Sequence, residues 1–237
     1  MMVPTRSHLV VPLVVLVGLV VACVPPPGPP GPPVTTSTTS TTSTTTVPQY
    51  VLSVGHADIF EVTVVGSTLS VQIEDESSVP TVYRNPAQTL LHVKPSAQTA
   101  VPAPPGGFSF LGGGGTPVWI LPQFQNPSLL WPGTSTERIA AGALQGNTVT
   151  WRIESVTGPG GFHVYTTNGF GVPSVLFTTN APLPQSTTLL VPTHSHYNWA
   201  FTASGTYTVT MRATATTSGG APITSGPVTY TFRVGTL

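Results

Sequence analysis

The chain has 237 residues, with seven basic and seven acidic side chains and a formal net charge of zero. Charged residues make up only 6% of it, against roughly 25% in an ordinary soluble domain. So few basic residues exclude a protein that binds nucleic acid through its phosphates. The 24 Gly and 27 Pro residues disfavour long helices and favour short strands.

Residues 1–22 are predicted to be a signal peptide. Arg6 precedes an apolar run from Leu9 to Val21, which is too short to span a bilayer as a mature helix. The run ends in Val-Val-Ala-Cys, a sequence that resembles the bacterial lipobox, and Cys23 is the only cysteine of the chain. We expect Cys23 to carry a lipid that anchors the protein to the membrane at the cell surface. The alternative is an ordinary secretory signal with an incidental cysteine.

Residues 23–48 are predicted to be the lipidated cysteine followed by a disordered linker. The linker begins PPPGPPGPP and continues with repeated Thr and Ser, a composition that offers no side chains for a core. Its extended length of roughly 75 Å makes it a stalk for the domain that follows.

Residues 49–237 are predicted to form one all-β domain. Apolar and polar residues alternate in several short stretches: Phe60–Val64, Thr68–Ile73, Val149–Glu154, Tyr207–Arg212 and Val228–Val234. Such alternation is typical of antiparallel sheets with one wet face, and two of these sheets bury their apolar faces by stacking. We therefore predict an antiparallel β-sandwich of Greek-key or jelly-roll type. The segment Ser204–Val209 resembles the tyrosine corner of such sandwiches.

The first candidate site is the pair His194 and His196. In an extended segment, residues two apart point the same way, so both imidazoles would project from one face at a spacing that suits a single metal ion. Tyr197, Trp199 and Phe201 would then occupy the opposite face and pack into the core.

A second pair, His56 and Asp58, has the same spacing. Together with His194 and His196 it would supply three or four nitrogen and oxygen ligands, a set that suits Zn²⁺ better than Mn²⁺ or Cu²⁺. His163, after the turn Gly158–Phe162, is a further candidate for the fourth ligand. The prediction requires two distant segments of the chain to fold side by side.

Other interpretations of these residues stay open. A His-x-His pair can be only the polar face of a strand. Asn198 and Trp199, together with Trp131, could instead form a glycan-binding platform. Sequence motifs of hydrolases and nucleotide-binding enzymes are missing from the sequence, so we expect no enzyme, and a zinc hydrolase is the weakest alternative. The acidic run Glu74–Glu76 is interpreted as a solvated turn.

Four segments resemble one known family. They are VLSVGHADIFEV, VWILPQFQNPSLLWPGTSTE, GPGGFHVYTTNGFGVPSVLF and HSHYNWAFTASGTYTVTMRATA. In this order they are similar to the actinobacterial surface-anchored domain, also called the choice-of-anchor M domain, over residues 50–216. His56 and Asp58 match the family's GHxD motif, and His194, His196, Asn198 and Trp199 match its HxHxNW motif.

This resemblance implies a cell-surface domain found beside metal-type ABC transporters. It therefore implies a role in capturing or passing on a transition metal, with such a transporter or the cell-wall glycan as partner. Family members with a C-terminal sorting signal are held at the cell wall, whereas the last residues here carry no such signal. We expect the lipid at Cys23 to replace it.

Overall fold

The computed structural model describes residues 50–104 and 106–237. The predicted signal peptide, Cys23 and the stalk lie outside the described residues. None of the helices in the described part of the chain is both long enough and apolar enough to cross a membrane.

Three sheets make up the domain, and strands are numbered along the chain. Sheet A runs β1 (Tyr50–Leu52), β5 (Thr89–Val93), β17 (Val228–Val234), β15 (Gly205–Thr216), β9 (Thr148–Thr157) and β12 (Gln185–Leu190), with β16 (Pro222–Thr224) paired to β15. Sheet B runs β13 (His194–His196), β8 (Leu130–Ser135), β2 (Gly55–Val65), β3 (Thr68–Asp75) and β4 (Val82–Arg84). Sheet C runs β11 (Pro173–Thr178), β10 (Phe162–Thr167), β14 (Asn198–Phe201), β7 (Pro117–Leu121) and β6 (Gln98–Ala100). Four 3-10 turns, at Pro86–Gln88, Pro95–Ala97, Ser109–Leu111 and Gln145–Asn147, complete the elements.

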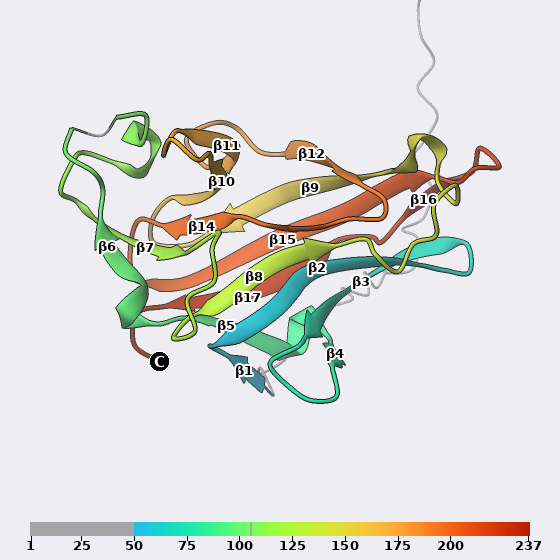
Figure 1. The fold of residues 1–237 in the computed structure, drawn as a ribbon, viewed down its shortest axis with the longest axis horizontal. Coiled ribbons are helices and arrows are strands. Elements are labelled where there is room, and N and C mark those ends of the chain that lie inside the picture. The colour runs from blue at the N-terminus through green and yellow to red at the C-terminus, as the bar shows by residue number, and fades with distance from the viewer. Residues whose placement is uncertain (1–49, 105) are drawn as a thin grey trace, which may run out of the picture. The chain divides into compact units, whose positions relative to one another are not determined.

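Sheets B and C pack on the same side of sheet A, so the domain is a two-layer β-sandwich, as predicted (Figure 1). The fully buried Trp151 of sheet A shows this directly. Its ring lies 5.3 Å from that of Phe60 in sheet B and 5.6 Å from that of Trp199 in sheet C, centroid to centroid. Burying an aromatic side chain of this kind contributes about 1.5–3 kcal/mol, so this aromatic cluster holds the two layers together.

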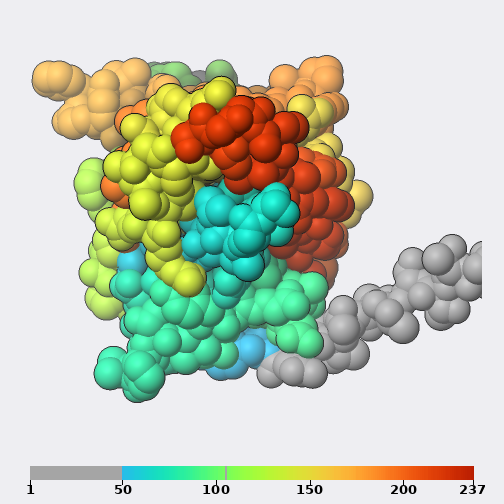
Figure 2. Space-filling view, turned by 90° about the vertical axis from the view of Figure 1, so that its right-hand side faces the viewer, coloured from blue at the N-terminus to red at the C-terminus, as the bar shows by residue number. Residues whose placement is uncertain are grey.

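The alternating pattern of the sequence correctly predicts the faces of the strands. In β9 Val149, Trp151 and Ile153 are fully buried, and the polar residues between them are partly exposed. The tyrosine corner is also present, because the Tyr207 hydroxyl donates to the Ala203 carbonyl at 2.9 Å. At the end of the sandwich shown in Figure 2, the β2–β3 turn lies beside the β15–β16 region, where the Thr68 hydroxyl donates to the Thr224 carbonyl at 2.5 Å.

The sheets are not purely antiparallel. Three pairs run parallel, namely β1 with β5, β5 with β17 and β2 with β8. Alternation reports which face of a strand is buried and carries no information about the direction of its neighbour. The parallel pairing of β2 and β8 positions the candidate site.

Strand β2 contains a bulge just after Asp58. Asp58 pairs with Gly133, Phe60 with Thr134 and Glu61 with Ser135, so the bulge inserts one extra residue. As a consequence Asp58 and Glu61 lie on the same face of sheet B, although three positions separate them. This face points away from sheet A, because Phe60 on the opposite face contacts Trp151.

Candidate metal centre

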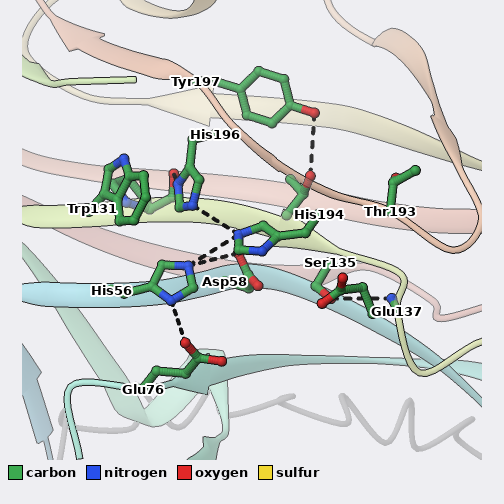
Figure 3. Close-up of polar contacts among 12 residues, drawn as sticks. His56, Asp58, Glu76, Trp131, Ser135, Glu137, Thr193, His194, His196 and Tyr197 are labelled. Atoms are coloured by element: carbon green, nitrogen blue, oxygen red, sulfur yellow. Dashed lines mark hydrogen bonds and ion pairs between the residues drawn. The ribbon is translucent and has the colours of Figure 1, made fainter. Parts of the chain in front are cut away.

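The candidate site lies on the outer face of sheet B, across three neighbouring strands. His56 and Asp58 come from β2, and His194 and His196 come from the edge strand β13. Strand β8 runs between them and pairs Gly133 with both Asp58 and His196. Side chains two apart on a strand share a face, so the pair from β2 and the pair from β13 converge over β8 (Figure 3).

The four side chains offer ligand atoms that all lie within 4.8 Å of one another, and this group could hold a metal ion. The Nε2 atoms of His56 and His194 are 3.2 Å apart, although 138 positions separate the residues in the chain. His194 Nε2 lies 2.9 Å from His196 Nε2 and 3.1 Å from Asp58 Oδ1. His56 Nε2 lies 3.7 Å from the same carboxylate oxygen. The predicted approach of the two segments is therefore confirmed.

Gly133 leaves the space into which these ligands point. A Cβ atom at this position would overlap Asp58 Oδ1 and would lie 2.9 Å from His196 Cε1. Any side chain at position 133 would therefore displace residues of the group from two strands at once.

Hydrogen bonds from the Nδ1 atoms orient the imidazoles of His56 and His196. The Nδ1 of His56 lies 2.6 Å from Glu76 Oε2, and the Nδ1 of His196 lies 3.2 Å from the Pro132 carbonyl oxygen. Both partners accept hydrogen bonds, so Nδ1 carries the proton in the neutral rings and the Nε2 lone pairs face the centre of the group. Acceptors of this kind commonly fix the tautomer of metal-bound histidines.

The spacing of the ligand atoms fits a small tetrahedral ion. Bonds of about 2.0–2.1 Å from zinc to imidazole nitrogen place neighbouring ligand atoms about 3.3 Å apart in a tetrahedron. Four of the six separations, from 2.9 to 3.7 Å, lie on both sides of this value, and the other two lie within 4.8 Å. Three imidazole nitrogens and a carboxylate oxygen directed at one point repel each other unless a metal ion or a ring proton lies between them.

Burial and neighbouring charges shift the pKa values of two ligands in opposite directions. Burial lowers the pKa of His196 to about 4, partly offset by its hydrogen bond to Pro132, so this ring is neutral at neutral pH. Burial also acts to lower the pKa of His56, but the carboxylates of Asp58 and Glu76 outweigh it and the net shift is upward. A proton therefore competes with a metal ion more strongly at His56 than at His196.

Comparisons with protein-family models, with curated proteins and with solved structures found no match. The geometry of the site is thus the basis for any statement about function, and the surface-anchored family stays a prediction.

His163 does not join the group of four ligands. It lies on β10 of sheet C, fully buried, with its Nδ1 2.9 Å from the Thr178 hydroxyl. Burial lowers its pKa to about 4. Of the two residues predicted for the fourth position, Asp58 lies in the group that could hold an ion, whereas His163 lies on a strand of another sheet.

Two of the three residues predicted to form a glycan platform are buried. Trp199 is fully buried against Trp151, so its ring is not available to a sugar. Asn198 is also buried, and its side-chain oxygen accepts a hydrogen bond from the backbone N–H of Gln123 at 2.9 Å. Trp131 is half-buried and stacks on His196, with ring centroids 3.6 Å apart and an interplanar angle of 6°.

The prediction missed Glu76 and Gly133. The acidic run was interpreted as a solvated turn. Glu76 does lie exposed in a turn, but it also orients His56, whereas Asp75 is fully buried and accepts a hydrogen bond from Arg84 at 2.7 Å. Gly133 follows Pro132, and such a pair normally indicates a turn. The role of Glu76 depends on the pairing of β2 with β3, and that of Gly133 on the register of β2 against β8, so neither is visible in the sequence.

Proposed function

We propose that this protein binds a divalent transition-metal ion at His56, Asp58, His194 and His196. The observation that carries the proposal is the convergence of three imidazole nitrogens and one carboxylate oxygen, all within 4.8 Å of one another. Among the possible ions, Zn²⁺ fits best, because three imidazoles and a carboxylate in a tetrahedron are typical of zinc. Cu²⁺ favours a tetragonal arrangement and Mn²⁺ an octahedron rich in oxygen, so both suit the site less well.

Binding fits the site better than catalysis does. Zinc enzymes use three protein ligands and keep the fourth position for water or substrate. Here Asp58 occupies a fourth position, 3.1 Å from His194 Nε2. A zinc hydrolase would need Asp58 to leave the ion, so we favour a protein that takes up and holds metal.

We further propose that the domain works at the cell surface as a lipoprotein. The basis is the lipobox at Cys23 and the proline-rich stalk after it, both in the sequence. A metal centre on such a stalk would suit the supply of a metal ABC transporter. Asn198, Trp199 and Trp131 gave the alternative of a glycan-binding module, but the burial of Trp199 makes its ring unavailable to a sugar.

The test is metal analysis of the purified full chain, followed by calorimetric zinc titration. We expect about one zinc ion per chain, and its loss from the His194→Ala/His196→Ala variant. The matched control is His92→Ala, which removes a buried histidine that lies outside the cluster and donates to the Gly235 carbonyl at 2.8 Å. Equal zinc content in the wild type and the double variant would refute the proposal.

A further inference from the structure

The three histidines of the centre are held in different ways. His56 is fixed by Glu76, and His196 is fixed by the Pro132 carbonyl and by stacking on Trp131. For the Nδ1 of His194, no hydrogen-bond partner is present among residues 50–104 and 106–237 (Figure 3). Within the cluster its ring lies beside the other two imidazoles, at centroid distances of 4.9 and 4.7 Å, and its Nε2 lies 3.1 Å from Asp58 Oδ1.

His194 is also the most exposed of the four residues. Its side chain is 30% exposed, against 15% for His56 and 3% for Asp58. It begins the three-residue edge strand β13, which pairs with β8. The site therefore opens to solvent on the side of His194.

The backbone at this position is nevertheless anchored. Just before His194, the Thr193 amide donates to the Thr136 hydroxyl at 3.0 Å, and the Thr136 amide donates to the Thr193 carbonyl at 2.9 Å. His194 itself pairs with Ser135. A movement of His194 thus needs only rotation of its side chain, which is fast for an exposed residue.

His194 is also the ring that can change its tautomer at least cost. Moving the proton of His56 or His196 from Nδ1 to Nε2 would break the hydrogen bond to Glu76 or to Pro132. The same change in His194 breaks no hydrogen bond with the described residues. In the absence of an ion His194 can therefore turn an Nε2–H toward Asp58, 3.1 Å away, and present a lone pair once an ion arrives.

From these differences we infer that His194 is the exchange ligand of the centre, a role that rests on the proposed metal binding. His56, Asp58 and His196 form the fixed part that holds the ion. His194 completes the tetrahedron and gives up its place to an incoming donor when the ion is loaded or passed on. One metal–nitrogen bond breaks and one bond to the donor forms, with no change in oxidation state.

The incoming donor is identified by its chemistry as an imidazole, carboxylate or thiolate group. It belongs to a small chelator or to a protein that presents such a side chain. An exposed, replaceable ligand distinguishes a centre that transfers its ion from a structural site, in which all ligands are buried and fixed.

The test uses Co²⁺ as a spectroscopic substitute in the full chain, with imidazole as the donor. The variants are His194→Ala and, as the matched control, His56→Ala, which removes a ligand of the fixed part. Absorption spectra report the coordination number, and transfer of Co²⁺ to an excess chelator reports the rate of release. Urea unfolding of the ion-free proteins shows whether both variants fold.

We expect His194→Ala to keep Co²⁺ but to release it at least about tenfold faster than the wild type, a change equivalent to 1.4 kcal/mol. Added imidazole should restore the wild-type spectrum of this variant. His56→Ala should bind Co²⁺ far more weakly and should not be restored by imidazole. Equal behaviour of the two variants, with a wild type that binds, would overturn the role of His194 and leave the proposed function intact. A wild type that takes up neither Co²⁺ nor Zn²⁺ would overturn both.

Discussion

Replacing Gly133 by alanine tests whether the ligands converge where the structure places them. The new Cβ would overlap Asp58 Oδ1 and would lie 2.9 Å from His196 Cε1 and 3.1 Å from His196 Nδ1. To restore van der Waals separation, the carboxylate oxygen has to move by on the order of 1 Å. Functional groups need to be held within about 0.5 Å of their working geometry.

The expected loss of zinc affinity can be worked out from this displacement. In enzymes, a 1 Å misplacement lowers the rate about 100-fold. The same factor in zinc affinity corresponds to about 2.7 kcal/mol of binding free energy. The cost in stability of the ion-free protein is that of an overpacked site, about 1–3 kcal/mol. Gly133→Ala should therefore fold and still bind zinc much more weakly than the wild type.

The assay is competition between the full chain and a zinc chelator, together with urea unfolding in the absence of metal. Gly169→Ala is the matched control, because no atom lies within 4 Å of a Cβ built there. It should bind zinc like the wild type. If Gly133→Ala also binds like the wild type, the space above Gly133 is not the metal site.

Three further predictions concern the surroundings of the centre. Glu76→Leu should lower zinc affinity by about 10–100-fold, the usual effect of losing a partner of a ligating histidine, and Glu76→Gln should lower it less because its amide oxygen still accepts from His56; equal affinities by calorimetry would contradict this. Zinc at about 100 times its Kd should raise the free energy of unfolding by about 2.7 kcal/mol and Tm by about 5–10 °C; an unchanged Tm in calorimetry would show that the folded state is not the form that binds. Burial raises the pKa of Glu61 to about 7 from an ordinary 4.5, so its favourable contribution to stability is complete below pH 4.5 and is lost as the pH rises through 7. Between pH 4 and 8, the free energy of unfolding of Glu61→Gln should therefore rise by roughly 3 kcal/mol relative to that of the wild type, as measured by urea unfolding. The control is Glu154→Gln, which removes a carboxyl whose pKa is lowered by Arg212. Its free energy of unfolding should change in the opposite direction.

The sequence predicts the strands of this domain well, because their faces are set by alternation. Val149, Trp151 and Ile153 face the core as their spacing requires. Trp199 is also buried as predicted, although the segment divides into β13 of sheet B and β14 of sheet C. Part of this success is local, since two residues of one strand share a face whatever their neighbours are.

The middle strand of the site could not be predicted in the same way. Strand β8 contains Pro132 and Gly133, residues that usually interrupt a central strand. Their roles depend on what lies on either side, since Pro132 offers a carbonyl to His196 and Gly133 makes room for Asp58. The contact of Glu76 with His56 likewise arises from the pairing of β2 with β3. Such features follow from register between strands, which the pattern of a single strand does not contain.

Two buried carboxyl groups on the outer face of sheet B differ in what surrounds them, and the difference shows what an ion at the proposed site would change. Glu61 is fully buried, and the nearest basic group in the described residues, Arg138 Nη1, is 3.6 Å from it. With a pKa near 7, this carboxyl reduces the cost of burial by taking up a proton.

Asp58 has a different environment. It is 2% exposed, and its Oδ1 accepts no hydrogen bond within the described parts of the chain. Its closest polar neighbours are the Nε2 atoms of His56 and His194, and Glu76 keeps the proton of His56 on the other nitrogen. A charge buried without a full set of partners costs several kcal/mol, whereas an ion bound at this point pairs with the carboxylate and with the lone pairs at once. The free energy of binding would then add directly to the stability of the fold, so the arrangement that is unfavourable in the empty domain becomes favourable in the loaded one.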